Sequence, residues 1–238
     1  MNAVKHIVKE IISSIYPYKC VCCGEILDEN NYICNNCNNS VERTNHNDVC
    51  LACGLEKDDC VCKYNIYRFN SLVCAFRNTG LARNAYYSYK FGKKQHYAEF
   101  FADEICYAIG KCYSDIKFDI ICAVPSFKKL GYDHSGYIAK AVSKKLGLPF
   151  TDKLLSCVKK GKKQHKSTII ERLHNVDGKY CVNYRADNMN ILLIDDIKTT
   201  GATLDECARV LLFAGANNVY CATALCATAD KNIKDLRR

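Results

Sequence analysis

The chain has 238 residues, of which 49% are hydrophobic and 25% are charged, and its formal net charge at pH 7 is +9. A chain of this length buries a core without disulfide crosslinks, and no apolar run is long enough to span a bilayer. These properties argue against a small scaffold that depends on disulfides and against a membrane-spanning helix, whereas the positive charge supports nucleic-acid contacts without proving them.

Residues 1–17 are predicted to form an amphipathic helix, because apolar side chains recur there at helical spacing. Lys5, Lys9 and Glu10 interrupt the apolar residues, which is unlike a secretory signal peptide. We therefore expect a cytoplasmic protein without a membrane span.

Half of the 18 cysteines lie before residue 63. Two C-x-x-C-G motifs, at 20–24 and 50–54, are offset by thirty residues like an imperfect repeat, and a second cysteine pair follows each of them. Tetrahedral zinc takes four such thiolates, so the spacing predicts two Cys₄ zinc sites in a zinc-ribbon-like module over residues 18–64, with Cys22 left over. The predicted ligands are Cys20, Cys23, Cys34, Cys37, Cys50, Cys53, Cys60 and Cys62.

A disulfide framework is the competing interpretation of these cysteines. Cytosolic cysteines at such spacings are more often metal ligands, which favours zinc. Whether the ligands pair sequentially or interleave stays open from the sequence. The short spacing between Cys60 and Cys62 makes the second site the less regular one.

From residue 67 onward, strand and helix patterns alternate, which predicts an α/β fold with a doubly wound, mainly parallel sheet over residues 65–238. The expected strands are 68–76, 118–124, 191–194 and 219–225, with weaker strands at 154–158 and 180–184. The expected helices are 81–91, 96–113, 137–146 and 202–213. The absence of a low-complexity linker predicts that the cysteine module packs against this sheet domain.

The stretch 191–204 carries the strongest functional signal. Four apolar residues read as a buried parallel strand that ends in Asp195 and Asp196, and a small, hydroxyl-rich turn then opens a helix. Ligands bind at this end of open α/β sheets, a helix N-terminus suits a phosphate, and two acids suit a diol or Mg²⁺. The pattern predicts a site for a phosphorylated sugar with vicinal hydroxyls. The alternative is an ordinary turn whose acids and threonines merely cap the helix.

This stretch resembles the phosphoribosyl-pyrophosphate (PRPP) motif of type I phosphoribosyltransferases, with four apolar residues, two acids, two variable positions and T-G-x-T. The resemblance implies a type I phosphoribosyltransferase-like sheet and binding of PRPP together with Mg²⁺. Asp195 and Asp196 would hold the ribose hydroxyls. The residues that would surround the 5′-phosphate are Thr199, Thr200, Gly201, Ala202 and Thr203.

Across nearly its whole length the chain also resembles the ComF family of amidophosphoribosyltransferase-like competence proteins. The shared features are a cysteine module, a K-F segment at Lys90 and Phe91, a V-P turn, the PRPP motif, and Gln164, Arg172 and Asn175 between the last two. The family joins a zinc module to a phosphoribosyltransferase-like domain and is linked to natural transformation. The V-P turn implies a pyrophosphate site at Pro125 and Ser126, to which Lys128 would add positive charge.

Residues 130–134 read L-G-Y-D-H where the family commonly has R-G-F-N-Q, so an arginine and two amides are replaced. Asp133 is a candidate helix cap there, and His134 its solvated neighbour. A second departure is Thr199, which stands where 6-oxopurine phosphoribosyltransferases typically have an aspartate that serves the purine N7.

The densest run of charge lies at residues 159–166. It is interpreted as a solvated loop, as a contact for nucleic-acid phosphates, or as the flexible loop that closes over the substrate in type I phosphoribosyltransferases. In the last case Lys162 and Lys163 are the candidate catalytic residues, because a lysine there stabilises the leaving pyrophosphate.

Two functions follow. The first is transfer of phosphoribose from Mg²⁺-PRPP to an unidentified acceptor. The alternative is a non-catalytic or PRPP-sensing protein of DNA uptake, with single-stranded DNA or the competence helicase machinery as its partner.

Overall fold

The computed structural model describes residues 17–27, 31–60, 62, 67–92, 94–126, 133–158 and 178–227. Five parallel strands form the central sheet in the order β1-β7-β6-β2-β3. They are β1 (Ser71–Arg77), β2 (Ile120–Ala123), β3 (Phe150–Thr151), β6 (Asn190–Lys198) and β7 (Asn218–Cys226). Two further strands, β4 (Leu155–Cys157) and β5 (Tyr180–Val182), pair antiparallel with each other outside this sheet.

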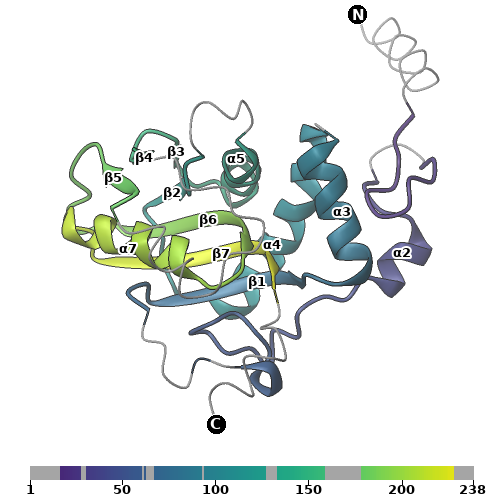
Figure 1. Cartoon of the computed structure of the whole chain (residues 1–238), viewed down its shortest axis with the longest axis horizontal. Coiled ribbons are helices and arrows are strands. Elements are labelled where there is room, and N and C mark those ends of the chain that lie inside the picture. Colours follow the sequence, from purple (N-terminus) through teal and green to yellow (C-terminus); the bar gives the residue numbers. More distant parts are fainter. Residues whose placement is uncertain are drawn as a thin grey trace, which may run out of the picture.

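Helices cover both faces of the sheet (Figure 1), which confirms the predicted doubly wound α/β class. One face packs against α3 (Gly80–Phe91), α4 (Ala98–Cys112) and α5 (His134–Leu146). The other face packs against α7 (Ala202–Phe213). The remaining helical segments are α2 (Asn35–Ser40), η1 (Lys57–Asp59) and η2 (Gln95–Tyr97).

The central strand β6 is apolar without alternation because both of its faces are buried. Its first apolar residues, Ile191 to Ile194, are fully buried, and they belong alternately to the two packing clusters. A parallel strand covered on both sides requires such a continuous apolar run. The strand therefore carries the residues that follow it to one fixed end of the sheet.

The prediction that this strand ends at the two acids is wrong. β6 continues to Lys198, because β7 goes on pairing with it through Asp195↔Thr223 and Lys198↔Cys226. On its other side β2 stops pairing at Ala123↔Ile194. The acids therefore lie within a strand that has a partner on one side only. Pairing with β7 therefore holds the backbone of the acids on one side, whereas no strand lies against their other side.

The other strands and helices predicted from residue 67 onward are present with shifted ends. α5 begins earlier than expected, at His134, because the Asp133 side chain accepts a hydrogen bond from Gly136 N and caps the helix. The predicted cap is thus confirmed. The short strand β3 was not predicted, since two residues carry no periodic signal.

The cysteine module packs along the free edge of β1. Leu72 N donates to Leu51 O at 2.7 Å, and Thr44 N donates to Ala75 O at 3.0 Å. Cys53 and Leu55 are buried in the core beneath α7. The predicted packing of the module against the sheet is therefore present, whereas the division into residues 1–17, 18–64 and 65–238 remains a prediction.

The expected amphipathic helix falls almost entirely on residues 1–16, which lie outside the described residues. Within the described ranges, no helix is long and apolar enough to cross a membrane.

Candidate functional site

Two adjacent carboxylates on β6 form the centre of the site. Asp195 and Asp196 are each 8% exposed, although carboxylates are rarely buried without partners. Their partners come from α3 and α5, two helices distant in sequence that meet at the carboxyl end of β2 and β6. Specific contacts from these two helices therefore hold the acid pair in place.

Asp195 is held through one oxygen. Its Oδ1 atom accepts hydrogen bonds from Ser135 Oγ at 2.8 Å and from Asp196 N at 2.9 Å. Burial, reinforced by the neighbouring Asp196 charge, raises the pKa of Asp195 to about 7, although the Ser135 bond opposes this rise. This carboxyl group therefore changes charge near neutral pH.

Asp196 is also held through one oxygen. Its Oδ2 atom accepts from Tyr86 OH at 2.8 Å and forms an ion pair with Lys90 Nζ at 2.9 Å. Burial and the nearby Asp196 charge raise the pKa of Tyr86 above its ordinary value, so the phenol stays protonated and donates.

The start of α5 is joined to the end of α3. His134 Nε2 lies 3.0 Å from Lys90 O, and Tyr89 OH donates to His134 O at 2.7 Å. The expectation that His134 is merely solvated is therefore wrong. These bonds fix the helix end that carries Lys90 relative to the helix start that carries Ser135.

One oxygen of each acid has no hydrogen-bond partner among the described residues. Among the described residues, neither Oδ2 of Asp195 nor Oδ1 of Asp196 receives a hydrogen bond. Two neighbouring acceptor oxygens suit the two hydroxyl donors of a vicinal diol. The acids bond to Ser135, Tyr86 and Lys90 and not to the helix start, so the interpretation of them as caps of α7 is wrong.

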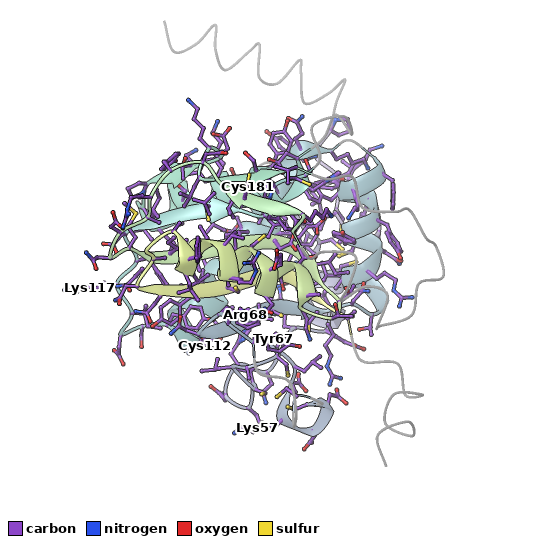
Figure 2. All side chains as sticks on the ribbon, turned by 60° about the vertical axis from the view of Figure 1, so that its left-hand side comes forward. Lys57, Tyr67, Arg68, Cys112, Lys117 and Cys181 are labelled. Carbon is purple, nitrogen blue, oxygen red and sulfur yellow. The ribbon has the colours of Figure 1, made fainter. Side chains whose placement is uncertain are left out.

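The predicted phosphate turn follows β6 and opens α7. Gly201 has φ +84°, and a Cβ atom there would lie 2.9 Å from the ring of Tyr67, whose hydroxyl donates to Thr200 O at 2.9 Å. Tyr67 lies beside α7 with its neighbour Arg68, which bonds to Asp205 (Figure 2). The tyrosine ring thus shapes a turn that only glycine accommodates.

The first turn of α7 presents backbone donors. Gly201 caps the helix without a side-chain bond, and Ala202 N reaches Thr200 Oγ1 at 3.3 Å. The N–H groups of Thr203 and Leu204 are those that an α-helix leaves without an intrahelical acceptor. Thr199 is exposed and Thr203 is half-buried at this end of the sheet.

The V-P turn lies beside the acids. Val124 N donates to Ile194 O at 2.9 Å, so Pro125 and Ser126 leave the sheet next to the point where β6 carries the acid pair. The other predicted residues of this region, Lys128, Lys162 and Lys163, fall outside the described residues. β4 and β5 hold the two ends of the segment that contains these last two lysines, with Val158 N donating to Lys179 O.

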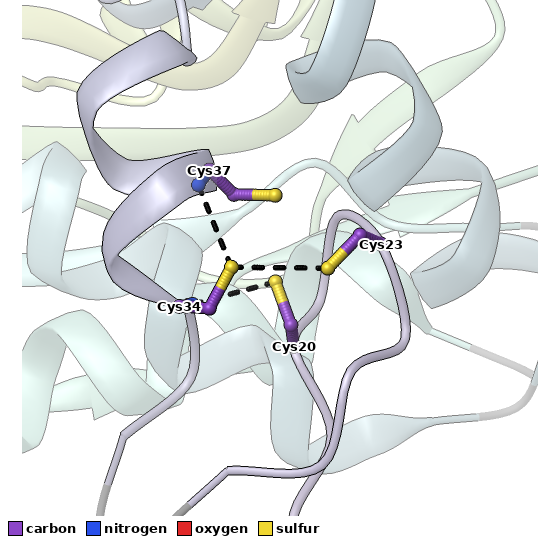
Figure 3. A group of neighbouring side chains, drawn as sticks. All are labelled: Cys20, Cys23, Cys34 and Cys37. Carbon is purple, nitrogen blue, oxygen red and sulfur yellow. Dashed lines mark hydrogen bonds between the residues drawn. The ribbon is translucent and has the colours of Figure 1, made fainter.

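The cysteines gather in two separate clusters, and the sulfur atoms of the first converge on a common centre (Figure 3). In each cluster all four sulfur atoms lie within 4.8 Å of one another, so either could hold a metal ion. The pairing is sequential: the clusters are Cys20, Cys23, Cys34 and Cys37, and Cys50, Cys53, Cys60 and Cys62. None of the 18 cysteines forms a disulfide bond.

The thiol spacing of the first cluster fits zinc, and that of the second is less regular. Tetrahedral Zn–S bonds of ~2.3 Å require sulfur atoms roughly 3.8 Å apart. In the first cluster, the sulfur atoms of Cys23 and Cys34 are 3.8 Å apart. In the second, those of Cys53 and Cys60 are 3.7 Å apart, whereas Cys62 lies closer, with its sulfur 3.4 Å from that of Cys50 and 3.0 Å from that of Cys60. Burial raises the pKa of Cys20, but backbone N–H bonds from Cys23 and Cys34 outweigh it and lower this pKa to about 6, which favours the thiolate form.

The two knuckles repeat the same local geometry. In each, the first cysteine N–H bonds to the carbonyl five residues later, an antiparallel bridge flanks the turn, and the glycine has a left-handed φ. The hydrogen bonds are Cys20 N→Glu25 O and Cys50 N→Leu55 O. The bridges are Lys19↔Ile26 and Val49↔Glu56. The φ angle is +81° at Gly24 and +73° at Gly54. The imperfect repeat seen in the sequence is therefore a structural one.

Solved structures similar to this chain include several phosphoribosyltransferases. A purine phosphoribosyltransferase from Pyrococcus horikoshii matches at 16% identity and a TM-score of 0.35, covering 53% of this chain and 83% of its own. Adenine phosphoribosyltransferase from Saccharomyces cerevisiae matches at 15% identity and a TM-score of 0.37, covering 57% of this chain and 71% of its own. A hypoxanthine phosphoribosyltransferase from Staphylococcus aureus matches at 15% identity and a TM-score of 0.37, covering 58% of this chain and 69% of its own.

At these identities and TM-scores the likeness says nothing of activity. No protein-family model matches the sequence, and no curated protein matches it.

The sequence patterns do not reveal the residues that hold the acids, nor the tyrosine that packs on the phosphate turn. They indicate no role at the site for Ser135, Tyr86 or Tyr67, and Lys90 stands out only as part of the K-F segment. Tyr86 and Lys90 are four residues apart and so share a helix face, which was the available signal. For Ser135 and Tyr67 the sequence offers none, because their contacts are distant along the chain.

Proposed function

We propose that this chain binds PRPP at the carboxyl end of β6 and transfers its phosphoribosyl group to an acceptor, as a ComF-like phosphoribosyltransferase. The observation that carries the proposal is the pair of acids, each anchored by one oxygen and each leaving the other oxygen beside a turn rich in backbone donors. That combination suits a ribose that carries both vicinal hydroxyls and a 5′-phosphate.

In this proposal Asp195 and Asp196 accept the ribose hydroxyls, and the 199–203 turn receives the 5′-phosphate at the positive end of the α7 dipole. Pro125, Ser126 and Lys128 line the pyrophosphate side. Lys162 and Lys163 stabilise the leaving pyrophosphate, which is where such a reaction needs charge stabilisation. Mg²⁺ bound to the pyrophosphate group of PRPP, and not to the acid pair, would neutralise charge on the departing group. The two cysteine clusters hold structural zinc.

The alternative function, single-stranded DNA binding in natural transformation, depends on the basic run at 159–166. That run lies outside the described residues, and the alternative stays a prediction.

The decisive experiment is a calorimetric titration with PRPP in the presence of Mg²⁺. The wild-type protein should bind, and the double variant Asp195→Asn/Asp196→Asn should not, because each lost charged hydrogen bond costs about 1.5–3 kcal/mol. Asp119→Asn is the matched control, since this acid binds Asn190 N at the opposite end of β6.

Unchanged affinity in the double variant would refute the assignment of the site. Where binding is present, a screen for pyrophosphate release across nucleobases and other acceptors tests transfer itself.

A further inference from the structure

The acid pair already has a cation beside it, the ammonium group of Lys90. Its ammonium lies 2.9 Å from Asp196 Oδ2 and also donates to Tyr86 OH. The Lys90 side chain is 32% exposed and that of Asp196 is 12% exposed, so the ion pair is partly screened from water yet reachable by a ligand. An ammonium group has three N–H donors. The contacts with Asp196 and Tyr86 use two of them, which leaves the third for a ligand.

A divalent cation fits these residues poorly. Mg²⁺ demands near-octahedral oxygen coordination and usually relies on carboxylates that carry full negative charge. Here the Asp196 charge is already balanced by Lys90, and the pKa of Asp195 near 7 leaves that group partly protonated at neutral pH. The described residues therefore do not form a carboxylate site for Mg²⁺.

We propose that Lys90 is the resident cation of this site, so that the phosphoribosyl ligand binds to the acid pair without a divalent ion. The inference rests on the proposed function, because it concerns the same ligand. The free donor of the ammonium contacts a ribose hydroxyl or a phosphate oxygen, while the two free carboxylate oxygens accept from the ribose. Lys90 thus holds the position between acids and polyanion that a metal ion would otherwise occupy.

The test is PRPP binding measured by calorimetry with and without Mg²⁺, using the full chain. The Mg²⁺-free buffer is passed over a chelating resin before the protein is added, which leaves metal on the cysteine clusters in place. The wild-type protein should bind with similar affinity in both buffers. Lys90→Met should bind roughly ten- to a hundredfold more weakly without Mg²⁺, and added Mg²⁺ should restore much of the loss.

Two controls separate this role from a structural one. Lys90→Arg keeps the charge and should retain Mg²⁺-independent binding. Lys117→Met removes a lysine where β2 and β6 begin, as Lys117 O accepts from Asn190 Nδ2, and should leave binding unchanged (Figure 2).

Wild-type binding that requires Mg²⁺ would overturn this inference and leave the proposed function standing. An equal loss in both buffers for Lys90→Met would show a purely structural lysine and would also overturn it. Absence of wild-type binding in either buffer would refute the proposed function itself. The wild-type comparison needs no variant, so the inference remains testable even if Lys90→Met does not fold.

Discussion

Ser135 Oγ donates a 2.8 Å hydrogen bond to Asp195 Oδ1, joining the first turn of α5 to the central strand across sixty residues of chain. Both side chains are almost fully buried. The bond opposes the rise in the Asp195 pKa that burial causes. Ser135 therefore both orients this carboxylate and keeps more of it ionised.

Ser135→Ala should weaken PRPP binding by about tenfold, the equivalent of one lost hydrogen bond to a charged group. The loss should be greater below pH 7 than above it, because without the hydroxyl the pKa of Asp195 rises further. Calorimetry at two pH values checks this. Ser143→Ala is the control on the same helix, since Ser143 bonds to Leu148 O instead. A pH-independent loss would contradict the role of Ser135 in ionisation.

Asp195→Asn should stabilise the ligand-free protein at alkaline pH. The pKa of about 7 in the folded protein lies above the ordinary aspartate value of 3.8, so between these pH values the native state retains a proton that the unfolded chain releases. The contribution of Asp195 to stability is thus fully present at low pH and is lost as pH rises through 7. Asp195→Asn should raise the free energy of unfolding by up to about 4 kcal/mol above pH 7, and by little below pH 4. Thermal unfolding across this range measures it, and a pH-independent shift would contradict it.

Purified protein should carry one to two zinc ions per chain, with at most one in each cysteine cluster. Cys20→Ser/Cys23→Ser should lose the first metal and unfold the surrounding module, because metal binding and folding are coupled there. Cys22→Ser is the matched control, since Cys22 belongs to neither cluster. Elemental analysis and circular dichroism report both effects. Protein without zinc, with disulfides found by mass spectrometry, would refute the assignment.

Hypoxanthine and guanine should be poor acceptors. Thr199 stands where an aspartate would serve the purine N7, and a threonine hydroxyl does not ionise near neutral pH and is no general base. Thr199 is exposed, so Thr199→Asp is sterically tolerable and should gain activity on 6-oxopurines. Nucleotide formation is followed by chromatography. Efficient inosine or guanosine monophosphate synthesis by the wild-type protein would show that another residue handles this proton.

Gly201→Ala should disrupt the phosphate turn. The new methyl group would meet the Tyr67 ring at 2.9 Å, and the backbone would keep a φ of +84° that alanine rarely adopts. We expect a destabilisation of about 1–2 kcal/mol together with weaker PRPP binding. Gly110→Ala is the control, because a Cβ atom there meets open space in α4. Gly110→Ala should be neutral or stabilising, and equal effects of the two substitutions would contradict the role of the turn.

The sequence predicted what is encoded locally. The apolar run before Asp195 and the helix at 202–213 depend on residues next to one another, and both are present as expected. The continuation of β6 to Lys198 depends on its partner β7, which no local pattern reveals. The same holds for Ser135 and Lys90, which reach the acids through the packing of α5 and α3. The pairing of the cysteines likewise required the folded chain.

The packing of the cysteine module against β1 has a consequence for association between molecules. β1 is the outermost strand of its sheet, yet all but its last residue are buried, since Leu51 and Thr44 bond to its outer edge. Gly54 makes this close approach possible, because a side chain there would strike Cys74 and Leu72. An open strand edge is a template for pairing with another chain. The cysteine module thus covers an edge that would otherwise be open to a neighbouring chain. If its two cysteine clusters hold zinc as proposed, metal loss would expose this edge to strand addition.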